Sequence, residues 1–78
     1  MFGWEGICEF VSVAEQGGFT PAARKLGVSV AQVSRQVAQL EDMLRHHLFL
    51  RIRRRLQLTP AGALYVAEVN KILTQVDM

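Results

Sequence analysis

The sequence is poor in the features that stabilise secreted, membrane-spanning or disulfide-linked proteins. It holds one cysteine, so it cannot form an internal disulfide, and this fits a reducing compartment. No apolar run approaches the roughly 20 residues that a membrane helix needs. The first ten residues carry an acid instead of the basic lead-in of a secretory signal. We therefore expect a cytoplasmic protein.

Groupings typical of catalytic or metal sites are also missing. His46 and His47 are adjacent, so their side chains diverge, and no Cys or carboxylate cluster completes a metal site around them. Cys8 lies next to the apolar stripe of an expected helix and is predicted to be buried or half-buried, with no base near it in sequence. We expect no enzyme, no cofactor and no bound metal.

What the chain does contain is enough apolar material for one small domain and a segregated set of charges. Half of its 78 residues are hydrophobic, which predicts folding instead of disorder. Residues 1–19 hold three acids and no base, residues 20–59 hold eight bases and two acids, and residues 60–78 hold one base and two acids. The basic middle section indicates a polyanionic partner.

Residues 20–44 read as two helices joined by a tight turn. Thr20 followed by Pro21 predicts a capped helix start, and Gly27 predicts its end. The same helix N-terminus can also hold a phosphate at Thr20, with capping alone as the alternative. Ser29 with Gln32 three residues later predicts a capping box that opens a longer helix over about 30–44.

The apolar and polar residues of this segment separate onto two sides. The positions expected to pack between the two helices are apolar: Ala23, Leu26, Val28, Val33 and Val37. The outward face of the second helix is polar: Gln32, Ser34, Arg35, Gln36 and Gln39. This is the helix-turn-helix arrangement that fits a major groove, where Gln suits adenine and Arg suits guanine. The alternative is a solvated helix face.

Further elements flank this unit. A helix is expected over 4–16, with its buried stripe at Ile7, Phe10, Val11 and Ala14. Leu48, Leu56 and Leu58 flank an arginine-rich centre and predict a short two-stranded ribbon. Thr59 with Pro60 repeats the cap-and-proline start and opens a last helix, whose apolar surface suggests a partner helix from a second copy.

The chain resembles the N-terminal DNA-binding domain of LysR-type transcriptional regulators over about residues 4–73. The residues that carry the resemblance are Phe19, Thr20, Ala22, Ala23, Val33, Ser34, Leu40, Glu41, Leu48, Phe49, Arg51, Leu58, Thr59, Ala61 and Gly62. The resemblance implies a mainly α, winged helix-turn-helix fold with a three-helix core, a two-stranded wing and a C-terminal dimerisation or linker helix. It also implies a bacterial regulator whose larger effector-binding domain is absent from this chain, so that the chain is a fragment.

Three positions depart from the family pattern. Val30 stands where the family usually has Gln, so it offers only apolar contact, for instance to a thymine methyl. Arg45 replaces a helix-ending Gly, which costs roughly 1 kcal/mol if the residue must be left-handed. Ile52 and Arg53 replace a small polar pair before the wing tip and make the wing more basic.

These observations together predict sequence-specific binding of double-stranded operator DNA by residues 1–59, with residues 60–78 as the linker or dimerisation helix of a homodimer. The expected DNA contacts are Thr20, Ser29, Val30, Ala31, Gln32, Ser34, Arg35, Gln36, Arg51, Arg53 and Arg54. The expected dimer contacts are Leu64, Tyr65, Val69, Ile72, Leu73 and Val76. We expect a nucleoid-associated location and no membrane or small-molecule partner.

Two alternatives stay open. The cluster Arg51, Arg53, Arg54 and Arg55 is expected to lie on phosphates or in the minor groove, but it could be a solubilising loop or a general anion-binding patch. The whole chain could be a winged-helix protein-interaction module that docks an acidic partner.

Overall fold

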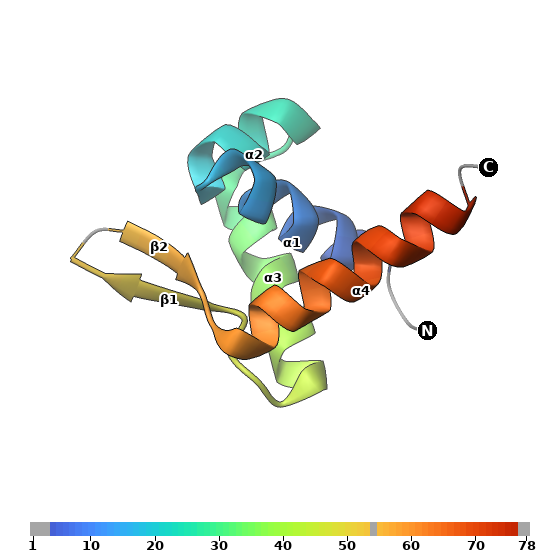
Figure 1. Cartoon of the computed structure of the whole chain (residues 1–78). Coiled ribbons are helices and arrows are strands. Elements are labelled where there is room, and N and C mark those ends of the chain that lie inside the picture. Colours follow the sequence, from blue (N-terminus) through green and yellow to red (C-terminus); the bar gives the residue numbers. More distant parts are fainter. Residues whose placement is uncertain (1–3, 54, 77–78) are drawn as a thin grey trace. The chain divides into compact units, whose positions relative to one another are not determined.

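A computed structural model describes residues 4–53 and 55–76 of the chain, with side chains described for residues 6–53 and 55–72. This part is mainly helical and contains four helices and one two-stranded antiparallel sheet (Figure 1). The predicted mainly α, winged helix-turn-helix class is confirmed. The chain divides into two compact units, residues 1–46 and residues 47–78.

The first unit is a three-helix core. Its helices are α1 (Trp4–Gln16), α2 (Phe19–Leu26) and α3 (Val30–Leu44), and each packs against the other two. The buried apolar residues of this unit are Ile7, Phe10, Val13, Ala22, Ala23, Val33, Val37 and Leu40. The predicted bounds of α1 and of α3 are confirmed.

The buried stripe of α1 differs from the prediction by a small rotation of the helix. Val13 is fully buried, whereas Val11 and Ala14 are only half-buried. The rotated face also buries two polar residues, Glu9 and Ser12. The sequence predicted the stripe through Val11 and Ala14 because both are apolar. Glu and Ser are mostly exposed in proteins, so the burial of Glu9 and Ser12 was not expected.

The start of α2 corrects a second prediction. Gly18 is extended (φ 177°, ψ 166°), and the helix begins at Phe19 instead of Pro21. The first helical bond runs from the Ala22 N–H to the Gly18 carbonyl at 3.3 Å. Thr20 therefore lies inside the first turn, and no side chain caps this helix. The predicted cap at Thr20 is wrong.

The turn between α2 and α3 follows the sequence closely. Gly27 adopts the left-handed conformation (φ 73°, ψ 31°) and ends α2, as predicted. The Ser29 hydroxyl accepts a hydrogen bond from the Gln32 N–H at 3.0 Å, which confirms the cap of α3. Among the described residues, no reciprocal bond from the Gln32 side chain completes a capping box. Leu26 is 38% exposed, so its predicted burial is wrong.

The C-terminal end of α3 is closed by an arginine in a glycine-like conformation. Arg45 is left-handed (φ 58°, ψ 35°), and its N–H donates to the Asp42 carbonyl at 3.3 Å. The next amide, from His46, donates to the Glu41 carbonyl at 3.2 Å. The condition set for Arg45 in the sequence analysis is therefore met, and a left-handed arginine costs roughly 1 kcal/mol relative to glycine.

The second unit consists of a hairpin followed by a long helix. The strands β1 (Phe49–Ile52) and β2 (Arg55–Leu58) pair antiparallel, and α4 (Pro60–Val76) follows and contacts β2. Thr59 caps α4, because its hydroxyl accepts the Gly62 N–H at 2.9 Å. The same hydroxyl donates to the His47 carbonyl at 2.5 Å. The predicted cap-and-proline start at Thr59 and Pro60 is confirmed.

Candidate nucleic-acid interface

The outward face of α3 is polar and open to solvent. Its exposed residues are Val30, Ala31, Gln32, Ser34, Arg35 and Gln39, and Gln36 is half-buried. On the opposite side, Val33, Val37 and Leu40 are almost completely buried, three to four residues apart. Burial of that seam orients the helix, so the polar face is presented outward as a result of core packing.

The polar groups of this face are available to a ligand. Within the described part of the chain, the side chains of Gln32, Ser34 and Arg35 form no hydrogen bond or ion pair. The Ser29 oxygen accepts the capping bond from the Gln32 N–H, and its O–H can still donate. Unpaired amide, hydroxyl and guanidinium groups on one helix face can match the donors and acceptors of base edges.

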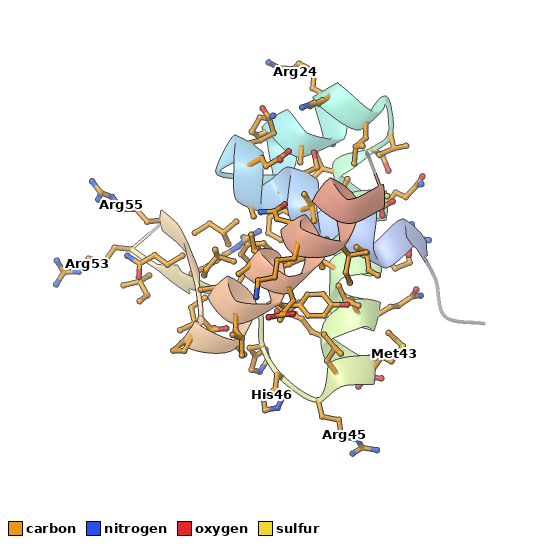
Figure 2. All side chains as sticks on the ribbon, turned by 45° about the vertical axis from the view of Figure 1, so that its right-hand side comes forward. Arg24, Met43, Arg45, His46, Arg53 and Arg55 are labelled. Atoms are coloured by element: carbon orange, nitrogen blue, oxygen red, sulfur yellow. The ribbon has the colours of Figure 1, made fainter. Side chains whose placement is uncertain are left out.

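Helix α2 adds exposed polar and basic groups to the first unit. Thr20 lies in its first turn and is exposed. Arg24 and Lys25 lie in its last turn, where positive charge suits the helix C-terminus. Figure 2 shows the Arg24 side chain extending into solvent from this helix.

The hairpin distributes its arginines between two faces. Paired residues point to the same side, and successive residues alternate. Arg51 pairs with Leu56 and Ile52 pairs with Arg55, so Arg51 and Arg55 lie on opposite faces. Arg53 forms the turn in a left-handed conformation (φ 50°), and Figure 2 shows Arg53 and Arg55 extending outward from the hairpin. Arg54 lies outside the described residues.

The face with Ile52 and Arg55 is also partly apolar. Leu50, which pairs with Gln57, is 46% exposed, and Ile52 is 47% exposed. In the sequence the arginines form one cluster, but the register of the hairpin decides which of them share a face. This register places Arg51 and Arg55 on opposite faces.

The expected dimer contacts on α4 differ in exposure. Leu64 is 67% exposed and Ile72 is 49% exposed, eight residues apart along the helix. Tyr65 is half-buried, and burial raises the pKa of its hydroxyl above the ordinary value. Val69 is buried within the chain. The side chains of Leu73 and Val76 lie outside the described residues.

Other candidate chemistry is not assembled in the described part of the chain. Cys8 is exposed, so its predicted burial is wrong; it lies on the solvent side of the rotated α1 stripe. No group of three or more His, Cys, Asp or Glu side chains within residues 4–53 and 55–76 could hold a metal ion. No helix in these ranges is sufficiently long and apolar to span a bilayer.

Comparison with known proteins gives this architecture its family. The bacterial regulatory helix-turn-helix proteins of the lysR family match residues 6–63. An HTH-type transcriptional regulator of Xanthomonas campestris pv. campestris is 43% identical over 68 residues, which cover 87% of this chain and 20% of that protein. The HTH-type transcriptional activator AaeR of Escherichia coli is 42% identical over 68 residues, covering 87% and 22%.

Solved structures agree with the sequence comparisons. The crystal structure of the BenM_DBD/catB site 1 DNA complex is 34% identical with a TM-score of 0.89, and the match covers 97% of this chain and 85% of that one. The CbnR_DBD–DNA complex is 32% identical with a TM-score of 0.87, covering 97% and 87%. The chain spans about a fifth of the length of the curated relatives that it matches. It belongs to the lysR family of bacterial regulatory helix-turn-helix proteins.

Proposed function

We propose that this chain is the DNA-binding part of a bacterial LysR-type transcriptional regulator and binds double-stranded operator DNA sequence-specifically. The observation that carries the proposal is the exposed polar face of α3, whose Gln32, Ser34 and Arg35 side chains have no partner among the described residues. The chain that carries this face is 34% identical to a protein whose structure was solved in a complex with DNA. An α-helix with such a face fits the major groove.

The residues divide between base edges and the DNA backbone. Val30, Ala31, Gln32, Ser34, Arg35 and Gln36 are assigned to the major groove. Thr20 and Ser29 are assigned to phosphates near the N-terminal ends of α2 and α3; the Ser29 oxygen accepts the capping bond, and its O–H can still donate to a phosphate. Arg51, Arg53 and Arg54 are assigned to phosphates or to the minor groove.

The proposal includes a homodimer formed through α4. Residues 1–59 form the DNA-binding domain, and residues 60–78 link two copies through α4. Leu64 and Ile72 support this, since they leave a large part of their apolar surface in water. Tyr65, Leu73 and Val76 complete the proposed contact, whereas Val69, expected there from the sequence, is buried within the chain. The protein acts in the cytoplasm on the nucleoid, as a regulator and without catalysis.

The test of DNA binding is fluorescence anisotropy of a labelled duplex over a series of salt concentrations. A dimer that covers about 6–10 phosphates should lose about 10³–10⁵ in affinity between 50 and 200 mM salt. A folded sample with weak binding and a flat salt dependence would contradict the proposal and favour an acidic protein partner. Arg35→Ala should relax sequence preference, whereas Arg45→Ala, at the other end of α3, should not.

The test of assembly is sedimentation equilibrium of the chain and of Leu64→Glu. Because Leu64 is exposed, the substitution should leave the fold intact and shift a dimer to monomer. A monomer at every concentration for the unchanged chain would exclude self-association of these 78 residues through α4.

A further inference from the structure

Val30 is a large apolar side chain on a helix face whose other long side chains are polar. It is the first residue of α3, immediately after the Ser29 cap, and it is 43% exposed. Gln32, Ser34 and Arg35 follow it and are exposed as well. The core does not account for Val30, since the buried seam of α3 starts at Val33.

The position of Val30 is also fixed in space. The hydrogen bond from the Gln32 N–H to the Ser29 hydroxyl sets where the helix begins. A β-branched side chain has a strongly preferred χ1 in a helix, so the two Val30 methyl groups point in a defined direction. Such a side chain presents a rigid apolar surface and loses little side-chain entropy on contact.

A valine has neither a donor nor an acceptor, so it cannot distinguish base pairs by hydrogen bonding. The major groove offers one apolar group, the methyl at C5 of a pyrimidine, which thymine carries. Residues at the N-terminus of a recognition helix are those that contact base edges. Ser34 lies one turn further on the same side of α3, and its hydroxyl can bond a neighbouring polar base edge.

We infer that Val30 makes the operator preference of this protein depend on a pyrimidine 5-methyl group. The contact buries a Val30 methyl against the C5 methyl, with Ser34 bonding the adjacent base pair. Thymine and 5-methylcytosine present the same methyl at this place, so either can supply it. The inference rests on the proposed DNA binding and assigns a specific chemical preference to it.

The experiment replaces single thymines of a selected operator by deoxyuridine, which removes only the methyl group. Burial of one methyl corresponds to a loss of about 3–5-fold in affinity, expected at one thymine per half-site. At that position four base pairs are then compared by anisotropy: T·A, U·A, C·G and 5-methyl-C·G. The duplex with T·A should bind more tightly than the one with U·A, and the duplex with 5-methyl-C·G more tightly than the one with C·G, by a similar factor. A gain for thymine alone would contradict the inference that 5-methylcytosine can supply the methyl group equally well.

Variants of Val30 assign the effect to this residue. Val30→Thr keeps the branched shape but replaces one methyl by a hydroxyl, and Val30→Ala removes both methyl groups. The thymine-to-uridine ratio should fall towards 1 in Val30→Ala and to an intermediate value in Val30→Thr. Leu26→Ala, an exposed apolar residue outside α3, is the matched control and should keep the full ratio.

The outcomes separate this inference from the function on which it rests. Tight, salt-dependent binding with no loss at any deoxyuridine would overturn the role of Val30 and leave DNA binding intact. A methyl effect of unchanged size in Val30→Ala would also overturn it, because another residue would then make the contact. Absence of binding to every duplex would instead reject the proposed function itself.

Discussion

The dipeptide Thr-Pro occurs twice in this chain, and only the second copy caps a helix. Thr59 caps α4, is 9% exposed, and uses its hydroxyl both to accept from the Gly62 N–H and to donate to the His47 carbonyl. Thr20 lies inside the first turn of α2, is exposed, and has no side-chain partner among the described residues. The same two residues therefore stabilise the fold in one place and face solvent in the other.

The difference arises from the residues on either side of the dipeptide. Before Thr20, Gly17 (φ 79°) and the extended Gly18 turn the chain early, so that α2 starts at Phe19. Before Thr59, strand β2 holds the backbone extended up to Leu58, and the helix can start only after the threonine. A local capping signal thus predicts a possible cap, and the preceding backbone decides whether it is used.

The largest expected effect concerns the glycines beside the two dipeptides. A Cβ at Gly62 would lie 2.2 Å from the Leu48 carbonyl oxygen, whereas one at Gly18 would meet only the Pro21 ring at 3.5 Å. Gly62→Ala should therefore lower the free energy of unfolding by about 3 kcal/mol or more, and Gly18→Ala by less than about 1 kcal/mol. Urea unfolding of both variants checks this. Equal losses would mean that the entry to α4 is not tightly packed.

The next effect is expected at the threonines themselves. Thr59→Val keeps the shape but removes one acceptor and one donor at a buried site, so we expect a loss of about 2–3 kcal/mol in unfolding free energy. Thr20→Val should change stability by no more than about 0.5 kcal/mol. Thr59→Ser, which keeps the oxygen, serves as the control and should recover most of the loss. A tolerated Thr59→Val would show that the cap contributes little.

A smaller effect is expected at the third helix start, where Ser29 caps α3 from an exposed position. Ser29→Ala leaves the Gln32 N–H without its partner but accessible to water, so the expected loss is about 1 kcal/mol. Ser29→Asp should restore the cap and serves as the matched variant. Thermal unfolding of the pair measures the difference; a loss as large as that of Thr59→Val would contradict the distinction between exposed and buried caps.

The sequence predicted most elements because each has local signals at its ends. Gly27 and Ser29 bound α2 and α3 as expected, since a left-handed glycine or a hydroxyl cap acts within a few residues. What could not be predicted depends on packing or on register. The rotation of α1 buries Glu9, and the pairing of Ile52 with Arg55 fixes the faces of the wing. The outward face of α3 was predictable, because its buried seam repeats at helical spacing.

The smallest expected effect is on DNA affinity and concerns Thr20. Since the Thr20 hydroxyl has no partner among the described residues, it is free to bond a DNA phosphate at the start of α2. Thr20→Val should weaken binding to all duplexes about fivefold, the equivalent of one hydrogen bond worth about 1 kcal/mol, while stability stays unchanged. Thr20→Ser should bind as the unchanged chain does. Anisotropy on operator and random duplexes measures both variants. Full affinity in Thr20→Val would show that Thr20 does not contact DNA. The two Thr-Pro dipeptides would then differ only in whether the threonine caps its helix.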